Sequence, residues 1–292
     1  MAAERKTAAQ VVPLFPTFAA VQVADEVSVG RTLVHRAAPD VAKEAGIDLS
    51  DKPKVLLAIG AGNVGKTSIL RWVAERAVAA NRQTFFAAID PENRELSNYF
   101  EGVHEPASFE PNAVLSWLEK FLAFAMDNKA TAAIDVGGGD TSLGRLVAST
   151  PDIVQMAEDA GVAIVALYPL APRLSDLSAM ETLEKAGFQP KATAIVLNEG
   201  RADPTVPREE AFARTMQHSA YKAAIARGAQ QVWMPRLIPA KEVEDRRITY
   251  ADARDATPKK GVVPLGPFDR RRVGQWLLRM EAEFGGISTW LP

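Results

Sequence analysis

A glycine-rich turn between an apolar run and a helical pattern is the part of the chain best suited to chemistry. The stretch KVLLAIGAGNVGKTSIL, residues 54–70, contains the pattern G-x-x-x-x-G-K-T. Glycines let backbone N–H groups close around a phosphate, and a helix that begins there adds a favourable dipole. The pattern therefore predicts a phosphate-binding loop (P-loop), made of Gly60, Gly62, Asn63, Val64, Gly65, Lys66, Thr67 and Ser68.

Two side chains of this loop have definite expected roles in binding a nucleotide with Mg²⁺. Lys66 would reach the β- and γ-phosphates as a point charge, and the Thr67 hydroxyl would ligate Mg²⁺. The alternative is a glycine loop that binds nothing. The strand pattern before the loop and the helix pattern after it favour the nucleotide site.

Two acidic residues at the ends of expected strands add to this pattern. Asp90 ends TFFAAID and Asp135 ends TAAID, which the glycines 137–139 follow. Because the carboxyl ends of parallel strands open onto one crevice, both carboxylates are expected near the phosphates and their metal, where an acid can hold Mg²⁺ through water or orient the attacking water. The alternative for each is a residue that ends a strand or caps a helix. With the P-loop upstream, we favour catalytic roles for Lys66, Asp90 and Asp135.

Composition is that of an ordinary globular chain and excludes several kinds of site. The 292 residues are 47% hydrophobic and 24% charged, with a net charge of −2. This net charge argues against binding of nucleic acid through the electrostatic attraction of the whole chain. A local or indirect contact with DNA remains open. Without cysteine there is no disulfide or thiolate metal site, and the three histidines are widely separated. No apolar run is long enough to cross a membrane and the first residues do not resemble a signal peptide, so we expect a cytoplasmic protein.

Strand and helix patterns alternate from Lys54 onward, which predicts an α/β domain with a doubly wound, mainly parallel sheet of the P-loop NTPase fold. Residues 1–52 do not fit this pattern and are expected to form an N-terminal extension to a domain of residues 53–292. Residues 241–267 are polar and expected to be an irregular connection. Expected strands are 55–59, 84–89, 131–136, 162–168, 193–197 and 230–234, and expected helices 67–80, 111–128, 144–160, 175–186, 208–227 and 268–284.

The motifs together resemble the ParA/MinD (SIMIBI) superfamily of deviant P-loop ATPases, over about residues 54–240. IDPENRELSNYF is similar to the family's segment after the second strand, which implies that Asp90 positions the attacking water. AAIDVGGGD resembles the family's Walker B and switch II, which implies that Asp135 lies near Mg²⁺. ATAIVLNEGRA and VWMPRL resemble the two base-binding segments, which implies that Asn198 reads the adenine edge and that Pro235 lies beside the base.

The chain departs from the family at one position. Members usually carry a lysine after the first P-loop glycine, which reaches the partner's nucleotide in a dimer, whereas this chain has Ala61. GNVGKT is closer to the StbB- and TraL-like proteins of plasmid stability and conjugal transfer. The resemblance implies a slowly hydrolysing ATP switch for partition, stability or DNA transfer, with a homodimer and a partner protein as expected associations.

Several alternatives remain open from the sequence. One rival function is an ATP-dependent ligase of the dethiobiotin-synthetase or amidoligase branch, which would need convergent polar groups opposite the γ-phosphate; no such cluster follows Asp90. Another is a nucleotide-binding scaffold without turnover. The pattern of 268–284 fits a helix docked on the sheet better than a membrane-binding helix. The apolar residues of the extension would either form a dimer face or cover the protein's own sheet edge: Leu14, Phe15, Phe18, Val21 and Val23.

Overall fold

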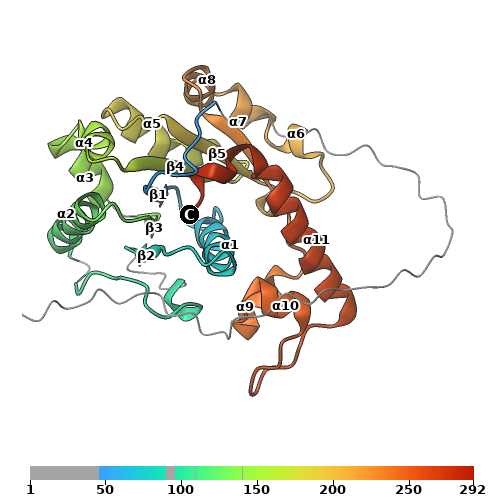
Figure 1. Cartoon of the computed structure of the whole chain (residues 1–292). Helices are drawn as coiled ribbons and strands as arrows, with labels where there is room; N and C mark the ends of the chain where they lie inside the picture. The colour runs from blue at the N-terminus through green and yellow to red at the C-terminus, as the bar shows by residue number, and fades with distance from the viewer. Residues whose placement is uncertain (1–45, 90–95, 109, 140) are drawn as a thin grey trace, which may run out of the picture.

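A six-stranded parallel sheet forms the centre of the computed structural model, which describes residues 46–89, 96–108, 110–139 and 141–292 (Figure 1). The strand order is β2-β3-β1-β4-β5-β6, and each neighbouring pair is parallel. This confirms the predicted α/β class and the doubly wound P-loop NTPase fold. The strands are β1 Lys54–Ala58, β2 Phe85–Ala88, β3 Ala132–Asp135, β4 Ala163–Leu170, β5 Ala192–Asn198 and β6 Gln230–Met234.

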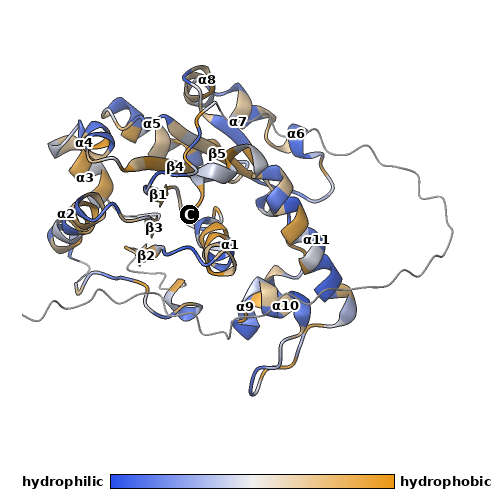
Figure 2. Cartoon of the chain, in the orientation of Figure 1, coloured by the Kyte–Doolittle hydropathy of each residue, from blue (hydrophilic) through white to orange (hydrophobic). Residues whose placement is uncertain are grey.

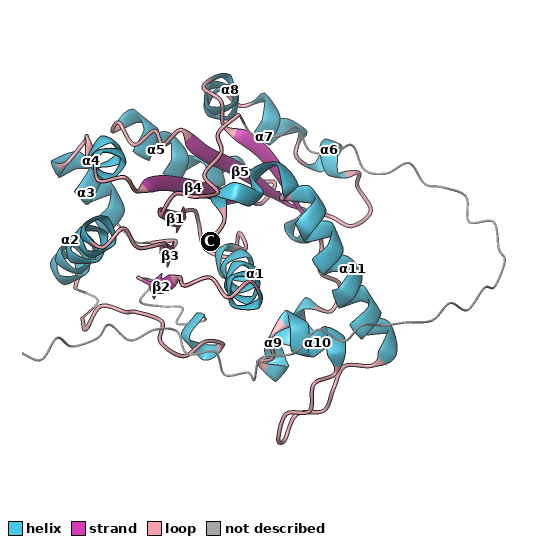
Figure 3. Ribbon diagram, viewed as in Figure 1, coloured by secondary structure: helices cyan, strands magenta, loops and turns pink. Residues whose placement is uncertain are grey.

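Helices cover both faces of the sheet, because the strands are apolar on both sides. Along β1, Val55 and Leu57 pack into one core, whereas Leu56 and Ala58 pack into the other. The first core is closed by helices α2 Pro111–Asp127, α3 Ser142–Ser149, α4 Ile153–Asp159, α5 Ser178–Lys185 and α8 Ser219–Ala226. The second is closed by α1 Lys66–Ala79, α9 Ala240–Arg246, α10 Tyr250–Asp255 and α11 Pro267–Glu283 (Figure 3).

The last long helix is docked on the sheet, as its apolar pattern predicts. Val273, Trp276 and Met280 of α11 are buried, and the Trp276 indole N–H donates to the carbonyl oxygen of Pro235 at 2.8 Å. Much of the rest of α11 is hydrophilic in Figure 2. None of the helices within the described ranges is long and apolar enough to cross a membrane.

Three expected elements differ from the structure. The helix predicted over 144–160 is interrupted between α3 and α4, because Pro151 forces Thr150 out of the helical region (φ −138°, ψ 74°). The helix predicted over 208–227 is three short ones, α6 Arg208–Ala211, α7 Ala213–Gln217 and α8, and His218 is extended where α8 begins. Residues 241–267 are not all irregular: they contain α9 and α10, and the Thr249 hydroxyl caps α10 by accepting from the Asp252 N–H at 3.0 Å.

Residues 46–52 precede the sheet, and some of them pack against the last residues of the chain. The Trp290 indole N–H donates to the Ile47 carbonyl at 2.9 Å, and the buried Lys54 ammonium donates to the carbonyls of Leu49 and Thr289 at 2.6 and 2.7 Å. Trp290 ends a 3₁₀ segment, Gly285–Trp290, that follows α11. The apolar residues of the extension named above lie outside the described residues, so their two alternatives remain predictions.

Candidate phosphate-binding site

The glycine-rich loop connects β1 to α1 in the geometry that its sequence predicts. Gly65 caps α1 in the left-handed region (φ 104°), and a β-carbon there would lie 2.5 Å from the Asn198 amide nitrogen. Asn63 is also left-handed, with φ 62°. Glycine is therefore required at position 65 on two counts, conformation and space. The first N–H groups of α1 face this loop, where an anion would find unsatisfied donors.

Lys66 is folded back over the loop that precedes it. Its ammonium donates to the carbonyl oxygens of Gly60 and Ala61 at 3.0 and 2.9 Å, and the residue is 6% exposed. The loop backbone thus fixes the position of a positive charge at the mouth of the turn. A phosphate in the turn would meet this ammonium together with the helix dipole.

Thr67 and Asp135 lie together at the carboxyl edge of the sheet. The Thr67 hydroxyl donates to Oδ2 of Asp135 at 2.9 Å, and Asp135 ends β3 opposite Ala58 of β1. Asp135 is only 3% exposed. A hydroxyl and a buried carboxylate at a phosphate site are oxygen donors of the kind that Mg²⁺ takes, with waters and phosphate oxygens completing the shell. The two predicted metal ligands therefore fit the ion.

One of the glycines that follow Asp135, Gly138, rests directly on the P-loop. A β-carbon at Gly138 would lie 2.4 Å from the Gly62 nitrogen and 2.9 Å from the Ala61 carbonyl carbon, whereas one at Gly139 would meet nothing within 4 Å. Only glycine allows this approach of the two backbones. The loop after β3 is thus in direct contact with the loop that precedes α1.

Asn198 braces the P-loop from the end of β5. Its amide nitrogen donates to the Val64 carbonyl at 2.8 Å, and its side-chain oxygen accepts from the Gly200 N–H at 2.8 Å. Pro235, which follows β6, is buried and accepts from Trp276. Both predicted base-binding residues stand at the carboxyl edge of the sheet, but the amide of Asn198 already has a protein partner at each end. Its reading of adenine stays a prediction.

Asp90 lies outside the described residues, so its position as a water-orienting acid is untested. The residue before it is placed: the Ile89 N–H donates to the Asp135 carbonyl at 3.0 Å, so β2 ends beside Asp135. The role of Asp90 therefore also remains a prediction.

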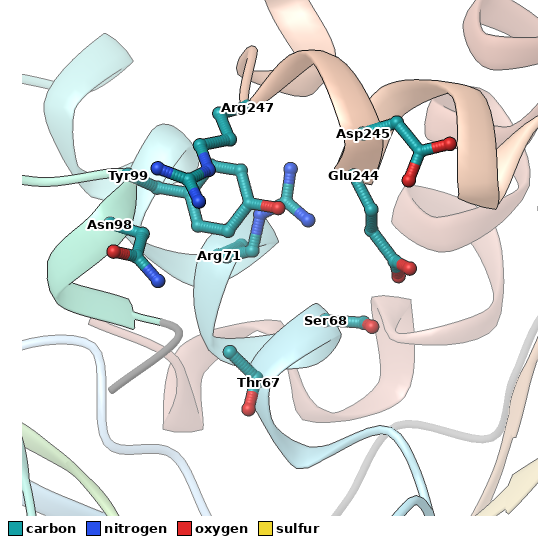
Figure 4. Close-up of a pocket in the computed structure, with 8 residues that line it drawn as sticks. All are labelled: Thr67, Ser68, Arg71, Asn98, Tyr99, Glu244, Asp245 and Arg247. Atoms are coloured by element: carbon teal, nitrogen blue, oxygen red, sulfur yellow. The ribbon is translucent and has the colours of Figure 1, made fainter. Parts of the chain in front are cut away.

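A polar cavity of about 330 Å³ lies beside Thr67, and it was not among the features predicted above. We name it the charged cavity; Figure 4 shows its lining residues, Thr67, Ser68, Arg71, Asn98, Tyr99, Glu244, Asp245 and Arg247. They come from α1, from the end of the 3₁₀ turn Leu96–Asn98 and the next residue, and from the end of α9 and the residue that follows it. Part of the lining comes from α9, a stretch far from Asp90 in sequence. That no polar cluster after Asp90 faces the γ-phosphate stays a prediction.

Arg71 is the buried charge of this cavity. Its guanidinium carbon lies 3.4 Å from the ring centroid of Tyr99 and 4.5 Å from that of Tyr250, and Nη2 donates to the Ile248 carbonyl at 3.0 Å. One turn later, Glu75 accepts from the N–H groups of Tyr250 and Ala251 at 2.7 and 2.9 Å. Burial raises the pKa of Glu75 to about 7, although these two hydrogen bonds act in the opposite direction.

Comparison with known proteins gives little beyond this geometry. No family model matches the chain, and no curated protein matches its sequence. Among solved structures it is similar to chloroplast FtsY from Physcomitrella patens, with a TM-score of 0.41 and 15% identity, covering 82% of this chain and 69% of that one.

It is also similar to the signal recognition particle receptor FtsY from Elizabethkingia anophelis, with a TM-score of 0.38, 13% identity and coverages of 78% and 66%. The same receptor in complex with GDP gives a TM-score of 0.40, 15% identity and coverages of 66% and 60%. The chain thus spans between 60% and 69% of the length of these proteins. Similarities of this size carry no conclusion about what this chain does.

Proposed function

We propose that this chain binds ATP with Mg²⁺ at the P-loop and acts as a nucleotide-dependent switch. The observation that supports it most is the arrangement of Lys66, Thr67 and Asp135, which sets an ammonium, a hydroxyl and a carboxylate around the start of α1. A triphosphate would take the ammonium and the loop N–H groups. Mg²⁺ would take the two oxygens and supply charge neutralisation at the phosphates.

Hydrolysis is expected to be slow. Ala61 brings no positive charge to the developing charge of the transition state, in contrast to the lysine that related ATPases carry at this place. Asp90 is the proposed positioner of the attacking water. Asn198 and Pro235 are proposed to lie beside the base, at the ends of β5 and β6.

The switch would be the loop after β3. Gly138 lies against Gly62, whose N–H belongs to the proposed phosphate cradle. A bound γ-phosphate changes what this loop can contact, and its loss after hydrolysis reverses that change. The process that we propose for the switch, plasmid or chromosome partition, plasmid stability or conjugal transfer, rests on the sequence resemblance. So do a homodimer and a partner protein.

Calorimetric titration of the full chain with ATP and Mg²⁺ tests the proposal. We expect saturable one-site binding, lost in Lys66→Ala and kept in Lys185→Ala, a control lysine that lies on the exposed surface. Absence of ATP or GTP binding to the wild type would refute the proposal. Stimulation of single-turnover hydrolysis by DNA or a partner protein would support the switch.

A second function gains support from the charged cavity. An ATP-dependent ligase needs a polar site for its acceptor near the γ-phosphate, and the cavity includes Thr67, the proposed Mg²⁺ ligand. A ligase would hydrolyse ATP only when a small carboxylate is present. Turnover that depends on a carboxylate and not on DNA or protein would favour it over the switch.

A further inference from the structure

We propose that the charged cavity binds a small dipolar molecule of the amino acid type, carrying one carboxylate and one ammonium. The inference goes beyond the proposed function and does not depend on ATP binding, because the charges that would hold the molecule belong to Arg71, Arg247 and Glu244, which lie outside the phosphate-binding loop. Its grounds are the two opposite walls of the cavity, their charges and its size.

One wall presents positive charge. Arg71 is 2% exposed, and its Nε–H has no acceptor among the described residues. Arg247 also lines this wall and takes part in no salt bridge within the described part of the chain. Within the described residues Arg71 forms no salt bridge, and Glu75, the acidic group with which it interacts on α1, is hydrogen-bonded to backbone N–H groups. A carboxylate that entered here would therefore offset part of the cost of burying the guanidinium. Asn98 and Tyr99 stand beside the two arginines (Figure 4).

The facing wall presents negative charge. Figure 4 shows the Glu244 carboxylate extending across the cavity toward Ser68. Where the structure describes the chain, Glu244 has no ion-pair partner, whereas the neighbouring Asp245 binds Lys241 at 2.7 Å. Glu244 is therefore the carboxylate left to receive an ammonium. Among the described residues, no salt bridge joins Glu244 to Arg71 or to Arg247.

The dimensions select a small molecule. A volume of about 330 Å³ is near the lower end for ligand pockets, roughly 300–1,000 Å³. A protein partner would need a far larger contact area. Because Thr67 and Ser68 belong to both the cavity and the start of α1, an occupant would also affect the nucleotide site, and the coupling would be reciprocal.

The test uses the full chain without nucleotide and the standard protein amino acids as probes, read by saturation-transfer NMR and by the shift in melting temperature. At least one amino acid should bind, whereas acetate and methylammonium, which carry only one of the two charges, should bind far more weakly. Glu244→Gln and Arg247→Gln should each weaken binding about tenfold or more, because each removes a charge-assisted contact. Both positions are exposed, so folding should be preserved.

Two exposed neighbours outside the cavity provide matched controls. Glu242→Gln and Lys260→Gln remove the same charges and should leave amino acid binding unchanged. No binding by any amino acid, or equal binding by the cavity variants and the controls, would overturn the proposal. Lys66→Ala separates it from the proposed function: that variant should lose ATP and keep the amino acid.

Discussion

Among single residues, Gly138 makes the closest backbone approach around the P-loop. A β-carbon at this position would lie 2.4 Å from the Gly62 nitrogen, so Gly138→Ala must push the two loops apart. We expect the free energy of unfolding to fall by about 1–3 kcal/mol, as for other overpacked sites. Urea denaturation measures this. Gly139→Ala, where a β-carbon meets nothing within 4 Å, is the control and should change stability by less than about 0.5 kcal/mol; equal losses would contradict the contact.

Glu75 should make stability depend on pH near neutrality. Its pKa is raised from 4.5 to about 7, so the folded state holds a proton that the unfolded state releases above about pH 4.5. The stabilisation from this proton is therefore complete below pH 4.5 and is lost as the pH rises through about 7. The loss would be about 3 kcal/mol, because each unit by which the pKa is raised corresponds to about 1.4 kcal/mol.

Urea denaturation of Glu75→Gln between pH 5 and 8 checks this prediction. The variant cannot titrate, so the fall in unfolding free energy that the wild type shows over this range should be absent or much smaller. Glu281→Gln removes an exposed carboxylate that pairs with Arg76 and should keep the wild-type pH profile. An unchanged profile in Glu75→Gln would show that another group titrates.

Among the elements, α11 is the helix whose role the sequence left between two alternatives. Trp276 is buried and hydrogen-bonded to Pro235, whereas Leu278 on the same helix is 74% exposed. Trp276→Ala should cost about 3–5 kcal/mol of unfolding free energy in urea. Leu278→Ala should cost less than about 0.5 kcal/mol. A small effect at Trp276 would mean that α11 contributes little to the core.

A helix, strand or loop of this chain can be predicted from the sequence when the residues that cause it lie within the element itself. All six strands and the P-loop follow from apolar runs and from glycines whose effect is confined to their own turn. The charged cavity does not, because α9 reaches α1 through packing between residues such as Val243 and the second core. The helix break at His218 was also not predicted, since the residue type alone does not distinguish a histidine that caps a helix from one inside a helix.

For the whole molecule, the proposed switch should associate only weakly. Because the chain has Ala61 in place of a lysine, one contact expected between a subunit and its partner's nucleotide is missing. We expect a monomer–dimer equilibrium that ATP shifts by about 1–3 kcal/mol, measurable by light scattering with and without Mg-ATP. Ala61→Lys should strengthen the dimer or raise turnover. A tight ATP-dependent dimer in the wild type would mean that another residue replaces the lysine, and a strict monomer would exclude the paired arrangement.

The strand order has a consequence for how the chain reaches its native state. β1 pairs with β3 and β4, not with β2, and every pairing in the described sheet needs a crossover connection. The P-loop contacts both partner strands: the Thr67 hydroxyl donates to Asp135 at the end of β3, and a β-carbon at Gly60 would lie 3.1 Å from the Pro169 carbonyl of β4. The cradle is therefore complete only after chain segments more than a hundred residues apart have met.

Such non-local pairing is slow to form, and the nucleotide site should appear late on the folding path. A ligand that binds only the finished site stabilises the native state without stabilising the transition state that precedes it. Mg-ATP should therefore slow unfolding and leave the refolding rate unchanged, as stopped-flow fluorescence of the tryptophans would record. Faster refolding with Mg-ATP would instead place the assembly of β1, β3 and β4 before the rate-limiting step.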